Sequence, residues 1–405
     1  MIKKIIRYIG IKKFGWLEFF MALYPILAGY GYGSFQFAFG VLFILDVLIL
    51  FRGNYQKMKC LPLMVFFIYV IFHYMIWVLI MPSVPSYYIN SFIATIIYVI
   101  SVFIIAPQID YHKFKSTINL VAIICMIGMI YHITMLSFGQ SVSPIKLPFL
   151  PDMAQNTRLY QLFDRPTSFF WEPQSYASFM LFPLYFALYE RKLIYAFIIA
   201  ALMMASTSTT GLVLSILMFL LSLVSNRNKW HMSVFTIITV MALGYFLISS
   251  TYTIAGLEKF YNTEFEESNR VVNGLLILKN LNVEDIILGI PFANMQDAYD
   301  AGFFNTQLIV FEDGVLFVSA IWIALIQYGI IGLFLFLLPY FWIYKKDKLI
   351  FPLLTCIVVG HFSNPDFIGA AYVFQIITML VFVCKNVNTL KKKKYAGSNS
   401  YISVC

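Results

Sequence analysis

The sequence predicts an all-α fold, a polytopic integral membrane bundle of about 12 transmembrane helices. Hydrophobic residues make up 61% of the 405 residues and charged residues only 12%, whereas soluble domains contain about 25% charged residues. Long apolar segments recur along the chain, and basic residues cluster between them. We therefore count the chain in membrane spans, and expect a single transmembrane domain over residues 1–390 followed by a basic tail at 391–405.

Twelve apolar segments account for this bundle. Residues 193–206 are short for a span, because crossing a core of about 30 Å takes about 20 helical residues at 1.5 Å each. A re-entrant pair formed by residues 193–206 and 210–225 is the alternative, and it would leave ten crossings. Either number leaves both termini on the same side. The segments lie near residues 14–32, 34–51, 61–81, 91–107, 117–138, 171–189, 193–206, 210–225, 231–250, 316–343, 349–362 and 368–384.

The positions of Lys and Arg orient the bundle. With the N-terminus in the cytoplasm, 22 of the 28 basic residues fall in cytoplasmic segments. This positive-inside bias explains the net charge of +9 without nucleic acid as a partner. Both termini are accordingly expected in the cytoplasm. The six basic residues left on the outer face are Lys146, Arg158, Arg165, Lys259, Arg270 and Lys279.

Two long connections are predicted on the outer face, near residues 139–170 and 251–315. Connections of this length in a compact protein are usually functional or disordered, and the apolar residues of the second argue against disorder. Apolar residues recur at helical spacing over residues 269–281, with Ser268 at a position that fits an N-cap. We expect an amphipathic helix on the membrane surface, with Arg270 in its first turn. A helix that packs over the bundle is the alternative.

Nucleotide and metal motifs are absent from the sequence. It contains no GxxxxGK[ST] phosphate loop, no GxGxxG after a strand and no His or Cys pair with zinc spacing. Neither a metal nor any other cofactor is therefore expected. The five histidines lie on different segments, where packing is their usual role. His361, beside SNPDF at the outer end of its span, is retained as a candidate substrate contact.

The candidate chemistry lies on the outer face. Arg158 and Arg165 in the first long connection, and Arg270 in the second, place guanidinium groups where few bases occur. Arginine keeps its charge at any working pH, and its planar fork of donors suits phosphate oxygens. A pyrophosphate-linked lipid of the outer leaflet would fit these groups. The alternative is that the arginines extend to the membrane interface or pair with outer-face carboxylates.

Glu172 stands between Trp171 and Pro173 in the stretch RPTSFFWEPQSYASF. Burial among aromatic groups would raise the pKa of its carboxyl group, which suits general acid or base chemistry, whereas a nearby Arg165 would lower it. Proline disfavours helix at the residue before it and fits the first position of a helix. Glu172 is therefore expected at the N-cap of the next span, and a purely structural cap is the alternative.

Four stretches resemble the O-antigen polymerase (Wzy) family. RPTSFFWEP is similar to that family's Arg-x-x-Gly-x-Phe-x-Glu-Pro stretch, with Ser168 where glycine is usual. STSTTGLVLSILMFLL looks like its Ser/Thr-Thr-Gly opening of a later span, and IQYGIIGLFLFLLPY looks like the Gly-Ile-Ile-Gly span after its large outer loop. NRVVNGLLILKNLNVEDIILGIP is similar to its helix that begins with Arg and ends in Ile-Leu-Gly. The resemblance covers residues 158–345.

This resemblance implies a glycosyltransferase of the bacterial inner membrane, with its active site facing the periplasm. Such enzymes transfer a growing glycan from one undecaprenyl pyrophosphate carrier onto the terminal sugar of another carrier's repeat unit, without metal or nucleotide. Arg165 and Arg270 would bind the pyrophosphate, and Glu172 would be the base on the acceptor hydroxyl. Expected partners are the undecaprenyl-pyrophosphate-linked oligosaccharide, the lipid bilayer and a chain-length regulator protein. Further candidate substrate contacts are Arg158, Lys279, Asp313 and His361.

One departure from the family leaves the base open. The related O-antigen ligases, and many polymerases, place a histidine about one helix ahead of the Gly-Ile-Ile-Gly span, where this sequence reads FEDGVLFVSAIW. Glu172, Glu312 and Asp313 remain as candidate bases, and the assignment as a ligase is weakened. The sequence also leaves open a different surface-glycan polymerase or a polysaccharide flippase. A flippase that moves pyrophosphate should carry Lys or Arg inside its spans, and no predicted span has either at mid-membrane depth.

Overall fold

The computed structural model describes residues 8–9, 14–32, 35–53, 60–80, 86–150, 153, 165–225, 269–290, 318–364 and 367–394. These residues are mostly helical. The exceptions are loops and turns, short 3-10 segments, an isolated β-bridge between Tyr30 and Met153, and one hairpin of two-residue strands, β1 (Gly31–Tyr32) and β2 (Phe35–Gln36). The predicted all-α class is confirmed for this part of the chain.

Several helices have the composition of membrane spans. Four are long and apolar enough to cross a bilayer, namely α4 (Leu61–Ile80), α5 (Ser86–Ile105), α6 (Tyr111–Ser137) and α16 (Ala320–Lys346). They indicate a multi-pass membrane protein. The shorter apolar helices are α2 (Trp16–Leu27), α3 (Phe37–Phe51), α9 (Leu193–Ala205), α10 (Thr209–Ser225), α17 (Phe351–Gly360) and the first part of α18 (Ala370–Lys394).

The helix bounds differ from the predicted spans in places. α6 begins at Tyr111, six residues before the predicted start at 117, because the Asp110 carboxylate caps it by accepting the Lys113 N–H at 2.9 Å. α18 continues to Lys394, past the predicted end of the membrane domain at residue 390. The predicted span at 231–250 lies outside the described residues.

α16 (Ala320–Lys346) overlaps the predicted span at 316–343 from residue 320 onward and is broken at Gly329. The backbone angles there, φ 69° and ψ −176°, are not helical, so two helical segments meet at this glycine. A φ near +70° is a conformation that glycine adopts without steric cost. The apolar pattern of the sequence continues through the break and therefore did not reveal it.

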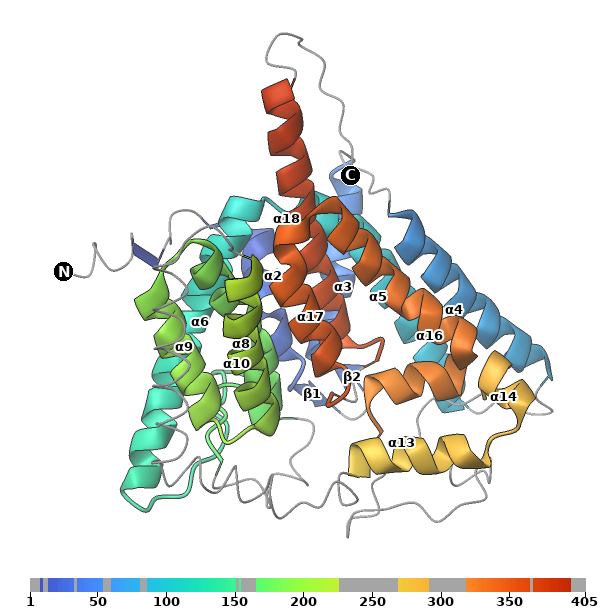
Figure 1. The fold of residues 1–405 in the computed structure, drawn as a ribbon, viewed down its shortest axis with the longest axis horizontal. Coiled ribbons are helices and arrows are strands. Elements are labelled where there is room, and N and C mark those ends of the chain that lie inside the picture. Colours follow the sequence, from blue (N-terminus) through green and yellow to red (C-terminus); the bar gives the residue numbers. More distant parts are fainter. Residues whose placement is uncertain are drawn as a thin grey trace. The chain divides into compact units, whose positions relative to one another are not determined.

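The chain divides into two compact units. Unit 1 comprises Met1–Val41, Ile109–Asn262 and Leu349–Gly360, and unit 2 comprises Leu42–Gln108, Thr263–Lys348 and His361–Cys405. In unit 1, α8 (Pro173–Tyr189) packs against α6, α9, α10 and α17, and most of its side chains are buried. Figure 1 shows α8, α9 and α10 side by side. A helix enclosed in this way can carry polar and aromatic residues that a lipid-facing helix would avoid.

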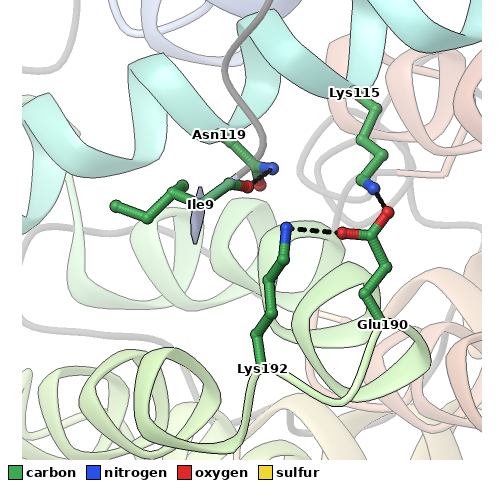
Figure 2. A network of polar contacts seen from close by, with 5 residues as sticks. All are labelled: Ile9, Lys115, Asn119, Glu190 and Lys192. Atoms are coloured by element: carbon green, nitrogen blue, oxygen red, sulfur yellow. Dashed lines mark hydrogen bonds and ion pairs between the residues drawn. The ribbon is translucent and has the colours of Figure 1, made fainter. Parts of the chain in front are cut away.

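A polar network joins α6 to the end of α8 in unit 1 (Figure 2). The Glu190 carboxylate pairs with Lys115 through Oε1 and with Lys192 through Oε2, the latter at 2.6 Å. One turn further along α6, Asn119 donates from Nδ2 to the Ile9 carbonyl at 3.1 Å. Because Lys115 is only 8% exposed, its charge depends on this carboxylate for compensation.

Unit 2 is built around α16, which packs against α4, α18, α13 (Asn269–Asn280) and α14 (Val283–Leu288). α4 and α18 also pack against α5. Aromatic rings fill much of the core. Phe336 of α16 stacks on Tyr372 at a centroid distance of 5.6 Å and meets the edges of Phe66 and His361.

Candidate functional site

Arg165 contacts the turn formed by STSTTG in unit 1. Its Nε donates to Thr207 Oγ1 at 3.1 Å, and its Nη2 donates to the Thr207 carbonyl at 2.9 Å. Thr207 lies between α9 and α10 with a φ of 58°. Two bonds from one guanidinium to one residue fix both the position and the plane of the group. Arg165 and Thr207 are 42 residues apart in the sequence. Their contact brings the RPTSFFWEP and STSTTG stretches together.

The STSTTG turn brings α9 and α10 close together. Ser206 caps the end of α9 and donates to the Met203 carbonyl at 2.7 Å, and the Gly211 N–H donates to Ser208 Oγ at 3.2 Å. A Cβ on Gly211 would lie 2.7 Å from the Met203 carbonyl oxygen. The two helices form a tight hairpin that needs a glycine at this point. Whether the hairpin crosses the membrane completely stays a prediction.

The loop between Arg165 and α8 is anchored at Ser168. The Ser168 hydroxyl donates to the Cys125 carbonyl at 2.7 Å, and the Ser168 carbonyl accepts the Ile145 N–H at 2.8 Å. Its φ is 57°, in the left-handed region that favours glycine. This is the position at which the polymerase-like motif has glycine, and the backbone gives a physical reason for that preference.

His132 is a residue of this site that the sequence did not reveal. Its Nδ1 accepts the backbone N–H groups of Thr167 at 3.2 Å and Ser168 at 3.3 Å. The sequence predicted only a packing role for His132. No local pattern could have found the contact, because His132 and Thr167 are 35 residues apart.

Glu172 occupies the N-cap position of α8, as predicted. Its φ of −145° and ψ of 156° are extended, Pro173 is the first helical residue, and the Glu172 carbonyl accepts the Tyr176 N–H at 3.3 Å. Its carboxylate makes no capping hydrogen bond. The structural alternative stays open, because Glu172 stands at the N-cap, at the positive end of the helix dipole. Its role as a base stays a prediction.

The other two family-like stretches meet in unit 2. The N–H of Ile290, just after α14, donates to the Ile326 carbonyl of α16 at 2.9 Å. Gly289 and Gly329 face each other across this contact with φ values of 84° and 69°. A Cβ on Gly289 would lie 2.2 Å from the Gln327 carbonyl oxygen, and a Cβ on Gly329 would lie 2.1 Å from the Ile287 carbonyl oxygen. Only glycine permits this approach of two backbones.

The predicted amphipathic helix is present as α13. Ile277 on one face is fully buried, whereas Lys279 in the last turn is exposed. Gly274 lies so close to α16 that a Cβ would be 2.3 Å from Trp322 Cγ. The alternative of a helix that packs over the bundle is therefore confirmed, and a position on the membrane surface stays a prediction. Figure 1 shows α13 and α14 beside the first part of α16.

The remaining candidate residues are placed unevenly. Arg270 lies in the first turn of α13, as predicted, but its side chain is outside the described part of the structure. Arg158 and Asp313 lie outside the described residues altogether. Arg165 belongs to unit 1, and Arg270, Lys279 and His361 belong to unit 2.

His361 is enclosed in the aromatic core of unit 2. It is 1% exposed, its Nε2 shares a hydrogen bond with the Tyr340 hydroxyl at 2.7 Å, and its ring lies 5.2 Å from that of Phe336. Its carbonyl accepts the Ile321 N–H at 3.3 Å. These contacts support a packing role, and its assignment as a substrate contact stays a prediction.

Metal ligands do not cluster in the part of the chain that the structure describes. Within it, no group of three or more His, Cys, Asp or Glu side chains is placed to bind a metal ion. The chemistry of the candidate site is that of guanidinium, hydroxyl and carboxyl groups held by backbone contacts.

No family model, no curated protein and no solved structure matches this chain.

Proposed function

We propose that this chain polymerises lipid-linked glycan repeat units, as O-antigen polymerases do. The observation that carries the proposal is the pair of hydrogen bonds from Arg165 to Thr207, which joins two of the four family-like stretches. The other two stretches meet through Gly289 and Gly329. Similar composition alone would not predict that these stretches contact one another. Here the contacts are made by residues of the stretches themselves, Arg165 with Thr207 and Gly289 with Gly329.

The proposed reaction is a glycosyl transfer. A hydroxyl of the acceptor repeat unit attacks the anomeric carbon of the donor glycan, and the bond from that carbon to the pyrophosphate oxygen breaks. The hydroxyl proton passes to a base, for which Glu172 is the candidate at the start of α8. Undecaprenyl pyrophosphate leaves with the bonding electron pair. The step needs no oxidant, reductant or nucleotide.

Arg165 would stabilise the departing pyrophosphate. A charge that is oriented before the reaction stabilises a developing anion better than one that must reorient. The two hydrogen bonds to Thr207 orient the guanidinium group before a substrate binds. Arg270 at the start of α13 is the second proposed ligand. A phosphate near that helix N-terminus would also be favoured by the helix dipole.

The proposed setting is the bacterial inner membrane. Twelve crossings would place both termini in the cytoplasm and the Arg165 loop in the periplasm, where lipid-linked repeat units are displayed after transport. The apolar helices support a multi-pass protein, and the excess of Lys and Arg in the predicted cytoplasmic segments supports this orientation. A chain-length regulator is a proposed protein partner.

Deletion of the gene tests the proposal through the surface glycan. We expect a single repeat unit on the surface and no ladder of longer chains, with the ladder restored by the wild-type gene. Arg165→Ala and Arg270→Ala should each fail to restore it at normal protein level. Arg52→Ala, at an exposed arginine at the end of α3, is the matched control and should restore it.

Other outcomes of the deletion point to other functions. Loss of every repeat unit from the surface would indicate a flippase. Accumulation of long lipid-linked chains that are not attached to the lipopolysaccharide core would indicate a ligase. An unchanged ladder in the deletion strain would refute the proposal.

A further inference from the structure

His132 and the backbone of the Arg165 loop form a hydrogen-bonded unit. His132 lies on α6 and is 1% exposed. Its Nδ1 accepts from the N–H groups of Thr167 and Ser168 at 3.2 and 3.3 Å. A ring nitrogen that accepts hydrogen bonds carries no proton, so a neutral His132 must carry its proton on Nε2.

The N–H groups of Thr167 and Ser168 converge on His132 Nδ1. Concavities of successive amides of this kind bind anions in many proteins. Here the lone pair on His132 Nδ1 occupies the position that an anion takes in those proteins. A doubly protonated ring has no lone pair to offer, and its positive charge would oppose the two N–H dipoles.

This contact is one of three anchors of a short loop. Ser168 is held by the Cys125 carbonyl and the Ile145 N–H, and Arg165 is held by Thr207. Only two residues separate Arg165 from Ser168, so a change in the backbone at Thr167 and Ser168 would move the guanidinium. Among these three anchors, the His132 side chain is the one that accepts hydrogen bonds from the backbone of both Thr167 and Ser168.

We propose that His132 is a positioning residue: its neutral Nδ1 holds the backbone at 167–168 so that Arg165 is presented to the pyrophosphate. The inference rests on the proposed function. His132 itself touches neither substrate nor reacting atoms in this account. It acts through the loop.

The other side of the ring makes the proposal testable by substitution. Among the described residues, His132 Nε2 is buried without a hydrogen-bond partner, and the Ser143 backbone interacts with the ring outside normal hydrogen-bond geometry. The ring is therefore held mainly from its Nδ1 side. Asparagine can place its Oδ1 near the position of Nδ1, whereas glutamine extends its amide toward the position of Nε2. Glutamine fills the histidine volume better, so packing alone favours glutamine and positioning favours asparagine.

The experiment compares His132→Asn, His132→Gln and His132→Leu in the deletion strain. We expect His132→Asn to keep most of the surface glycan ladder, and the other two to reduce it at least tenfold at equal protein level. The matched control is His112→Leu, at an exposed histidine on the same helix, which should leave the ladder unchanged. A ladder that is intact in His132→Gln, or stronger there than in His132→Asn, would overturn the inference.

A second measurement separates this inference from the proposed function. The full chain, labelled with ¹⁵N-histidine and reconstituted in lipid nanodiscs, should give a His132 signal of the neutral form protonated on Nε2, assigned by its absence in His132→Asn. A signal protonated on Nδ1 would refute the positioning role whatever the glycan shows. The expected tautomer, together with a deletion strain that keeps its ladder, would refute the proposed polymerase alone.

Discussion

Residues 165 to 168 contain both the candidate phosphate ligand of unit 1 and the turn that positions it. Arg165 supplies the charge, Ser168 supplies the turn, and both are bonded to residues distant in sequence. The sequence identified Arg165 and Glu172 from their types and neighbours. It did not reveal that Thr207 binds Arg165 or that His132 binds the backbone of the Arg165 loop, because those contacts depend on how the helices pack.

Two opposing effects on stability meet at Ser168, the cost of its left-handed backbone and the gain from its hydrogen bond to Cys125. Ser168→Gly removes a left-handed cost of about 1–2 kcal/mol and also removes the hydrogen bond to Cys125, worth about 1 kcal/mol. We expect thermal stability in detergent to change little and the glycan ladder to persist. Ser168→Val keeps the strained φ, adds a β-branched side chain and loses the hydroxyl, so it should lower both. Equal stability of the two variants would show that the left-handed turn does not matter.

At the scale of elements, helix positions were predicted well and their interruptions poorly. Apolar runs located the helices of both units, and Pro173 located the start of α8. The break at Gly329 and the early start of α6 escaped, because the first depends on a neighbouring backbone and the second on a single cap. The hydrophobic pattern indicates which residues are buried. Neither the break at Gly329 nor the early start of α6 alters that pattern.

The close approach of α14 to α16 predicts that alanine is tolerated at some glycines and not at others. Gly289→Ala and Gly329→Ala would each place a Cβ within 2.2 Å of a carbonyl oxygen. We expect either variant to lose monodisperse protein in fluorescence-detected size-exclusion chromatography. Gly139→Ala is the matched control, since it has a φ of 71° but nothing within 4 Å. It should cost only about 1–2 kcal/mol of backbone strain. Equal behaviour of all three would contradict the close contact.

The Glu190 network predicts how α6 and α8 are held together. Glu190→Gln leaves Lys115, with a side chain 10% exposed, without its carboxylate and should destabilise the protein by about 1–3 kcal/mol. Lys115→Met should be nearly neutral, because it removes the buried charge together with the need for compensation. Thermal unfolding in detergent measures both. A larger loss in Lys115→Met than in Glu190→Gln would argue that the ion pair itself stabilises the fold.

At the scale of the whole molecule, the charge distribution sets the expected orientation. In this account Lys279 faces the periplasm and Lys113 the cytoplasm. Lys279 is exposed and Lys113 is half-buried. A membrane-impermeant maleimide should label Lys279→Cys in spheroplasts. It should label Lys113→Cys only after permeabilisation, with the parent chain as the background control. The reverse pattern would invert the topology and place the Arg165 loop away from the proposed substrate.

The central claim is that this chain joins lipid-linked repeat units, and reconstitution tests it most directly. The purified protein in liposomes would receive undecaprenyl-pyrophosphate-linked repeat units extracted from the deletion strain, with a chelator and no nucleotide. We predict longer lipid-linked chains, one undecaprenyl pyrophosphate released per bond formed, and no product with Arg165→Ala. Folded wild-type protein that forms no glycosidic bond, or that only moves the lipid across the bilayer, would contradict the account.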